Sequence, residues 1–435
     1  MTVRIETSRR RRAISGLGLS GLLLACVIAP AAPAAAAATA EPAPSASEAG
    51  LDRQALRQTL DAIRAAGMYG VYSGVRDGSA RWNDAAGVAD VDTKRPVKPD
   101  MQHRVGSITK TFTAVAILQQ VEKGRIDLNA PIARYLPDLI PGERGQRVTV
   151  RMLLNHTSGI ADFIPGAFPS LVQGSGQSLD DNRFRTFRPE ELASIGLGFP
   201  PTNEPGQVSI YSNTNYVIAG MLLRKVTRTD PERYITDQVI RKAGLRETYF
   251  PRTPFITGPH SKAYEALYGL IDPPRDYSVY NMSWGGTAGA LVSTMDDLNR
   301  FYRLLLGGKI LRPAELAQMK TTVPVTDGLG NVVMNYGLGI YNEPTPCGPA
   351  WGHSGGVFGM GTYAMASEDG TRQISMGFNL MKYNEIDQNG QLLPHPIDYA
   401  IGGHLLQAMC GSAAPTARGA QPWAPFQADQ VRVKR

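Results

Sequence analysis

Residues 104–110 read Arg-Val-Gly-Ser-Ile-Thr-Lys and open the clearest helical run of the sequence, which we place at residues 107–123. Apolar residues recur along this run at helical spacing, at Phe112, Val115, Leu118 and Val121. Ser107 then lies in the first turn, where unpaired backbone N–H groups and the helix dipole create a positive environment. Lys110 follows three residues later and therefore shares its side of the helix.

The pair Ser107 and Lys110 has the composition of an acylation site. A serine hydroxyl becomes a nucleophile when a neighbour accepts its proton, and a lysine in a dry site at a positive helix end gives up its own proton more readily. The alternative is a helix-capping serine followed by a solvated lysine, because a Ser-x-x-Lys motif is short enough to occur by chance. The motif alone does not decide between the two.

Outward from this helix, the sequence predicts a block of helices between two groups of strands. Helical patterns lie at residues 51–66, 107–123, 148–155, 215–226, 231–243, 294–306, 313–319 and 397–409. Five strand patterns lie at residues 69–75, 80–89, 336–341, 358–366 and 373–380. Their hairpin-like connections predict an α+β fold with a five-stranded antiparallel sheet and flanking terminal helices. We assign residues 51–103 and 331–410 to a sheet subdomain and residues 104–330 to a large helical insertion.

The composition bounds the class of protein. The chain has 435 residues, 43% of them hydrophobic and 19% charged, with a net charge of +7, which excludes a disordered or fibrous protein. Residues 1–40 carry five Arg and one Glu, and residues 411–435 carry three Arg, one Lys and one Asp. Subtracting +4 and +3 from +7 leaves residues 41–410 neutral, so no basic surface for nucleic acid is expected.

The first forty residues have the layout of a secretory signal peptide. Residues 9–12 are arginine, residues 13–30 are largely apolar, and residues 38–40 read Ala-Thr-Ala. We predict a signal peptide at residues 1–40, a linker at 41–50 and a flexible tail at 411–435. The protein is then secreted, with no membrane anchor after cleavage. Two alternatives remain: an uncleaved membrane anchor and a lipoprotein attached at Cys26.

The cysteines agree with export. Beyond Cys26 the sequence contains only Cys347 and Cys410, an even pair in an oxidising compartment, where a disulfide is expected. The six histidines show no short metal-binding spacing. Neither a metal site nor a cofactor is therefore expected.

Two further motifs supply groups that an acylation site needs. Residues 211–213 read Tyr-Ser-Asn and provide a phenol that can relay a proton beside a lysine and an amide that can bind a substrate amide. Residues 351–356 read Trp-Gly-His-Ser-Gly-Gly. Their small side chains let a substrate lie against a strand edge, and the N–H of Gly356 can polarise a carbonyl. The alternatives are an ordinary polar turn and a Gly-rich hairpin connection.

In chain order, the three motifs resemble those of the serine β-lactamase and penicillin-binding protein superfamily. The sequence is most similar to secreted low-molecular-mass D-alanyl-D-alanine carboxypeptidases, whose third motif is His-Thr-Gly where residues 353–355 read His-Ser-Gly. The similarity covers roughly residues 50–410. It includes residues 104–110, 126–128, 154–159, 211–220 and 336–339, Trp284 and both cysteines, which such enzymes pair.

The resemblance implies a role for each motif residue. Ser107 would be the nucleophile that forms an acyl-enzyme, with Lys110 and Tyr211 as the proton-handling pair. The oxyanion hole would consist of the backbone N–H groups of Ser107 and Gly356. The residues expected to bind substrate are Asn213, Trp284, His353, Ser354 and Gly355, with His353 in place of the more usual lysine. Trp284 is also compatible with an ordinary core position.

One position departs from the carboxypeptidase pattern. The close carboxypeptidase relatives have an arginine for the terminal carboxylate of the peptide six positions before the first cysteine, where this chain has Tyr341. We expect a secreted, monomeric serine hydrolase, foremost a D-alanyl-D-alanine carboxypeptidase that acts on peptidoglycan stem peptides or reacts with β-lactams. A β-lactamase, an esterase or a D-amino-acid amidase on the same scaffold is the first alternative. A non-catalytic binder of wall peptides or β-lactams is the second.

Residues 352–356 also satisfy the Gly-x-Ser-x-Gly motif of α/β-hydrolases. That motif needs a strand before the serine and a helix after it. The Pro-rich residues 344–349 predict no strand, and the residues from 359 onward predict no helix. We therefore set this interpretation aside.

Overall fold

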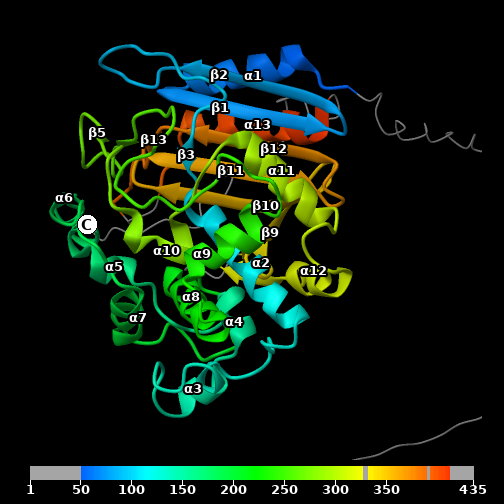
Figure 1. Ribbon diagram of the computed structural model, residues 1–435. Helices are drawn as coiled ribbons and strands as arrows, with labels where there is room; N and C mark the ends of the chain where they lie inside the picture. Colours follow the sequence, from blue (N-terminus) through cyan, green and yellow to red (C-terminus); the bar gives the residue numbers. More distant parts are fainter. Residues whose placement is uncertain (1–49, 327–331, 389–391, 412–435) are drawn as a thin grey trace, which may run out of the picture. The chain divides into compact units, whose positions relative to one another are not determined.

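The computed structural model describes residues 50–326, 332–388 and 392–411. The predicted signal peptide, nearly all of the linker and of the C-terminal tail lie outside the described residues. The main element is an antiparallel sheet of eight strands in the order β2-β1-β12-β11-β10-β9-β8-β7 (Figure 1). These strands are β1 Gly70–Asp77, β2 Ala80–Gly87, β7 Val323–Thr326, β8 Val332–Tyr336, β9 Tyr341–Thr345, β10 Gly348–Val357, β11 Met360–Ser367 and β12 Arg372–Phe378. Two small sheets pair β3 His103–Arg104 with β6 Val292–Ser293, and β4 Tyr264–Glu265 with β5 Arg275–Asp276 and β13 Leu380–Met381.

The predicted α+β class is confirmed, but the predicted count of five strands is wrong. Residues 337–340, in the middle of the strand predicted at 336–341, form the turn between β8 and β9. The strand β10 was missed because glycine and proline fill half of its ten positions, which lowers its β propensity. Residues 352–356 lie within β10 and lead by a hairpin into β11, so no helix follows the Gly-x-Ser-x-Gly motif.

Helices cover both faces of the sheet. The first and last described helices, α1 Arg53–Ala65 and α13 Pro396–Cys410, pack on one face, and α11 Met295–Leu306 packs on the other (Figure 1). Successive side chains of a strand point to opposite faces of the sheet, so each strand contributes to a hydrophobic cluster on either face. Val71 contributes to the cluster with α1 and α13, whereas its neighbour Tyr72 contributes to the cluster with α11.

The predicted disulfide between Cys347 and Cys410 is present, with the two Cα atoms 5.5 Å apart. It joins the turn between β9 and β10 to the last residue of α13. The cysteines are 63 positions apart, and in the chain-entropy account closing a loop of that length stabilises the fold by about 4 kcal/mol.

The segment that carries Ser107 belongs to the most enclosed helix of the protein. Ser107 lies in a 3-10 turn, Gly106–Ile108, that continues as α2 Thr109–Glu122. The sequence predicts one buried face for this helix, but eleven of the fourteen residues of α2 are buried. The helices α8 Asn213–Thr227 and α10 Gly286–Gly289 pack against it, and its Phe112 stacks on a ring of α11.

The other helices are α3 Glu143–Arg147, α4 Val150–Leu154, α5 Ile164–Ala167, α6 Gln177–Asp181, α7 Pro189–Gly198, α9 Pro231–Ile235 and α12 Pro313–Lys320. Short 3-10 or π turns lie at Ile132–Arg134, Pro169–Gln173, Thr236–Ile240 and Met282–Trp284. Across residues 50–411, gaps at 327–331 and 389–391 apart, no helix has the length and apolar character needed to cross a bilayer.

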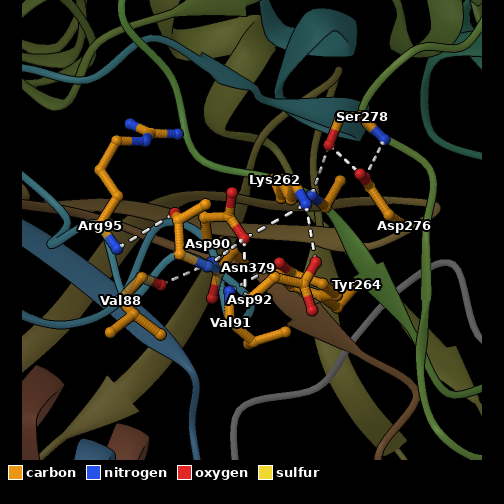
Figure 2. A network of polar contacts seen from close by, with 12 residues as sticks. Val88, Asp90, Val91, Asp92, Arg95, Lys262, Tyr264, Asp276, Ser278 and Asn379 are labelled. Carbon is orange, nitrogen blue, oxygen red and sulfur yellow. Dashed lines mark hydrogen bonds and ion pairs between the residues drawn. The ribbon is translucent and has the colours of Figure 1, made fainter.

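A polar network ties the small sheet of β4, β5 and β13 to the chain that follows β2 (Figure 2). Lys262, just before β4, lies 3.2 Å from a carboxylate oxygen of Asp90 and 3.0 Å from one of Asp92. Asn379, just before β13, donates to the carbonyl oxygen of Val88 over 3.0 Å. The network therefore fixes the start of β13, and the residue that follows β13, Lys382, lines the pocket described below.

Glu343, in β9, is expected to make the fold less stable as the pH rises. Its side chain is buried, and this burial raises its pKa to about 8. The folded protein therefore keeps a proton that the unfolded chain releases near pH 4.3. Stability is then highest below that pH and falls as the pH rises toward 8.

We expect Glu343→Gln to remove this decline. One pKa unit corresponds to about 1.4 kcal/mol. The free energy of unfolding of the variant should therefore exceed that of the wild type by at least this amount at pH 8.5 and by little at pH 4.5. Urea unfolding at the two pH values measures the difference. Equal pH dependence in both proteins would show that Glu343 ionises normally in the fold.

Candidate active site

Ser107 and Lys110 meet at the start of α2, as the sequence predicts. Lys110 Nζ lies 2.9 Å from Ser107 Oγ, and Lys110 is fully buried while Ser107 is 4% exposed. The same nitrogen lies 2.7 Å from Asn213 Oδ1 and 2.8 Å from the carbonyl oxygen of Ala288. These two oxygens fix the amine, so its remaining bonding direction is toward the serine hydroxyl.

Tyr211 lies against the same lysine. Lys110 Nζ is 4.9 Å from the centre of the Tyr211 ring. Tyr211 comes two residues before α8, whose first residue is Asn213, so the start of this helix brings the second motif to Lys110. The structure thus brings together Ser107, Lys110, Tyr211 and Asn213, while their roles remain predictions.

The turn that holds Ser107 and the strand β10 touch backbone to backbone. A Cβ atom added to Gly106, whose φ is +53°, would lie 2.6 Å from the backbone nitrogen of Gly356. A Cβ atom added to Gly355 would overlap the carbonyl oxygen of Val105 and lie 2.9 Å from the nitrogen of Ser107. Only glycine fits at these positions. The N–H groups of Ser107 and Gly356 therefore lie at one contact, as a two-donor oxyanion hole requires.

A pocket of about 320 Å³ opens beside Ser107. Tyr211, Asn213 and Gly356 also line it, and most of its remaining wall is apolar or aromatic: Phe163, Ile164, Pro165, Ile210, Trp284 and Phe358. The rings of Trp284 and Phe358 lie 5.2 Å apart, centre to centre. The pocket is thus suited to an apolar side chain next to the predicted nucleophile.

Asp162 holds Asn213 from the side opposite Lys110. The backbone N–H and the side-chain Nδ2 of Asn213 both donate to Asp162 Oδ2, over 2.9 and 2.8 Å. The other carboxylate oxygen accepts the N–H of Ile164 at 2.8 Å. Burial raises the pKa of Asp162, and neither these hydrogen bonds nor the charge of Lys110 offsets that effect. The negative charge of the Asp162 carboxylate is therefore only partly compensated by its neighbours. Asp162 also lines the pocket.

His353 does not line the described pocket. Its ring is fully buried, with Nε2 2.8 Å from the hydroxyl of Tyr336 and Nδ1 in contact with the carbonyl oxygen of Ser354. Burial, together with the charge of Lys110, lowers the pKa of His353 to about 3, so the ring is neutral. Ser354 and Gly355 are also absent from the lining of this pocket, and substrate binding by these three residues remains a prediction.

Tyr341, at the position where an arginine was expected, is also fully buried. Its ring lies 5.2 Å from that of His353 and it does not line the described pocket. Among the described residues, no group of His, Cys, Asp and Glu has an arrangement that could hold a metal ion.

Among the residues of this region that sequence reasoning missed are Asp162, His156, Phe358 and Lys382. Lys382 lines the pocket, with Nζ 3.0 Å from the buried carboxylate of Glu265 and 5.1 Å from the centre of the Phe358 ring. Asp162 and His156 lie in or next to residues 154–159, which were noted only as part of the resemblance. Lys382 stands alone after a two-residue strand, where no pattern in the sequence marks it.

The fold and the Ser107–Lys110–Tyr211 site define a serine β-lactamase-fold hydrolase. The family model named Beta-lactamase matches residues 53–391. The chain belongs to the Beta-lactamase family, which confirms the predicted superfamily.

Several known proteins are similar to the chain. A D-stereospecific amidohydrolase from Streptomyces sp. is 35% identical, with a TM-score of 0.72 over 83% of this chain and 100% of that one. Penicillin-binding protein 4* from Bacillus subtilis (strain 168) is 26% identical over 73% of this chain and 70% of its own length. Protein flp from Staphylococcus aureus (strain MW2) is 27% identical over 53% of this chain and 44% of its own length, so the chain spans less than half of that relative.

Gly355→Ala is expected to abolish hydrolysis without unfolding the protein. The added methyl group would push β10 away from Val105 and Ser107, and so separate the two N–H groups of the predicted oxyanion hole. Loss of one such donor costs about 100- to 1000-fold in kcat. Steady-state kinetics measure the loss, and circular dichroism checks the fold. Gly403→Ala, on α13 with open space around the added atom, is the matched control. Unchanged kcat in Gly355→Ala would contradict the close contact.

Proposed function

We propose that this protein is a secreted serine hydrolase that forms an acyl-enzyme on amides of D-amino acids with a free α-amino group. The observation that carries the proposal is the Asp162 carboxylate, which lines the same apolar pocket as Ser107. An ammonium group next to the scissile carbonyl would neutralise this carboxylate, whose pKa is raised by burial. The D configuration is supported by the similarity to the Streptomyces amidohydrolase.

In this mechanism Lys110 acts as the base in its neutral form. Its two N–H bonds are directed to Asn213 Oδ1 and the Ala288 carbonyl, and its lone pair accepts the proton of Ser107 Oγ, 2.9 Å away. Ser107 Oγ then bonds to the carbonyl carbon, and the N–H groups of Ser107 and Gly356 bind the oxyanion. The proton passes through Tyr211 to the leaving nitrogen as the C–N bond breaks. Water hydrolyses the resulting ester by the reverse proton path.

The second candidate is the D-alanyl-D-alanine carboxypeptidase expected from the sequence. Lys382 favours it, because its ammonium lines the pocket and is suited to attract a substrate carboxylate. Its ion pair with Glu265 already balances that charge, however, and Tyr341 offers no guanidinium. We therefore rank the carboxypeptidase below the D-amino-acid amidohydrolase.

The cellular setting is part of the proposal. Export follows from the predicted signal peptide, and the disulfide between Cys347 and Cys410 is suited to an oxidising compartment. Stem peptides of peptidoglycan or their fragments, and β-lactams, are the partners that the family membership supports. The monomeric state remains a prediction.

Lys110→Ala should lose acylation nearly as completely as Ser107→Ala, because nucleophile and base act as a unit. Mass spectrometry with a D-phenylalanine p-nitrophenyl ester and with penicillin follows the acyl adduct. Retention of more than about a tenth of the acylation rate, a barrier change below about 1.4 kcal/mol, would remove Lys110 from the base role. If the wild type forms no more acyl adduct than Ser107→Ala does, the protein is instead a non-catalytic binder.

Asp162→Asn tests the substrate class. The wild type should cleave D-phenylalanine p-nitroanilide at least about tenfold better in kcat/KM than its N-acetyl derivative, since a charge-assisted hydrogen bond contributes about 1.5–3 kcal/mol. In Asp162→Asn this preference should disappear, whatever happens to the absolute rate. A preference that survives the substitution would remove Asp162 from ammonium binding.

Peptides ending in free D-alanine and their amides separate the two candidates. If the wild type is an amidohydrolase of D-aminoacyl compounds, it should cleave the peptides with a free carboxylate and their amides at similar rates. Strong preference for the free carboxylate, together with poor cleavage of the nitroanilide, would favour the carboxypeptidase.

A further inference from the structure

His156 contacts Tyr211 and the chain on both sides of it. The carbonyl oxygen of His156 accepts the N–H of Ile210 at 3.0 Å, and its Nδ1 accepts the N–H of Ser212 at 3.2 Å. The imidazole ring lies 4.3 Å from the Tyr211 ring, centre to centre. One residue thus fixes the backbone before and after the phenol and packs against the ring itself.

The conformation of His156 suits this arrangement. Its φ is +63°, in the left-handed region where few residues other than Gly, Asn, Asp and His are found. Its side chain is fully buried, and the amide nitrogen of Asn215 also donates to Nδ1, over 3.2 Å. Because Nδ1 accepts hydrogen bonds, the neutral ring carries its proton on Nε2.

His156 is not suited to carry the proton in the reaction itself. Burial first, and then the charge of a protonated Lys110, hold its pKa well below the ordinary value. A protonated ring would also lose the acceptor for the N–H of Ser212. The ring therefore stays neutral and acts through its hydrogen bonds and its packing.

The chain before Tyr211 is only partly enclosed: Ser209 is buried and donates to the carbonyl oxygen of Asn155 over 2.8 Å, but its two neighbours are not buried. Val208 and Ile210 are exposed. The first turn of α8 fixes only the residues from Asn213 onward. Between these two parts of the chain, Ser212 Oγ donates to the carbonyl oxygen of Ala161, and His156 adds a restraint on both sides of Tyr211.

We propose that His156 is a positioning residue that holds the phenol of Tyr211 beside Lys110 during acyl transfer. The inference rests on the proposed acyl-enzyme function, in which Tyr211 relays a proton to the leaving nitrogen. It concerns a residue that does not itself line the pocket but packs against Tyr211, which does. Its loss should therefore slow the chemical step and leave substrate binding largely intact.

The test compares three substitutions of His156 with one of His404. His156→Asn keeps an acceptor and tolerates the positive φ, His156→Gly keeps the backbone conformation without an acceptor or a ring, and His156→Leu fills the volume without an acceptor. His404→Leu is the matched control. It also removes a fully buried, neutral histidine, which is hydrogen-bonded to Thr59 and Ser73 and lies outside the pocket lining.

Initial rates on D-phenylalanine p-nitroanilide give kcat and KM. Circular dichroism checks the fold of each variant, and mass spectrometry counts the acylated sites, so that rates can be expressed per folded protein. We expect His156→Gly and His156→Leu to lose at least about 100-fold in kcat, within the range for a misplaced proton-transfer group. KM should change less than about threefold. His156→Asn should recover to within about tenfold of the wild type, and His404→Leu should lower the unfolding midpoint without changing kcat per folded site.

A folded Gly or Leu variant with kcat within threefold of the wild type would overturn the inference. So would a folded Asn variant as slow as the other two. If neither Gly nor Leu folds, a kcat for His156→Asn reduced more than 100-fold would overturn it on its own. The wild type runs beside Ser107→Ala in the same assay: a wild type no faster than Ser107→Ala refutes the proposed function, whereas an active wild type with an unaffected His156→Gly refutes only the role of His156.

Discussion

The close backbone contact between Gly106-Ser107 and Gly355-Gly356 is the constraint on which the rest of the site depends. It joins the first turn of the most enclosed helix to the strand β10, which lies within the main sheet. A Cβ atom on Gly106 or Gly355 would overlap the backbone opposite, so the sequence keeps glycine at both positions, and Gly355 lowers the β propensity of β10. The contact in turn places the backbone nitrogens of Ser107 and Gly356 close to each other at the edge of the pocket, which both residues line.

Around this contact the polar groups form one connected chain. Lys110 joins Ser107 to Asn213, and Asn213 joins Lys110 to Asp162. The amide of Asn213 lies between the buried amine of Lys110 and the partly buried carboxylate of Asp162, so the two groups form no direct ion pair. Such an arrangement leaves the amine available to the serine and the carboxylate available to a cationic substrate group. Two buried, neutral histidines, His156 and His353, surround the aromatic side of the site without adding charge.

The sequence was a good guide to the reacting groups and a poor guide to their supports. Ser107, Lys110, Tyr211 and Asn213 lie in short motifs at helix starts, where local rules apply, and the structure brings all four together. Asp162 and His156 come from a loop whose path is set by hydrogen bonds to residues some fifty positions away in the chain, such as that between His156 and Ser212, which no local pattern encodes. The strand β10 escaped prediction for a related reason, since Gly355 is kept for its tertiary contact with Val105 and Ser107, which no local pattern encodes.

The enclosure of α2 on nearly all sides has a consequence for how this scaffold diversifies. A substitution on that helix disturbs several packed neighbours at once, so the hydroxyl and the amine it carries are hard to move during evolution. Other residues that line the pocket, Asp162, Phe163, Ile164 and Trp284, come instead from short, separately connected segments outside that helix. Proteins built in this way can acquire new substrates by exchanging their loops while the reaction itself stays the same.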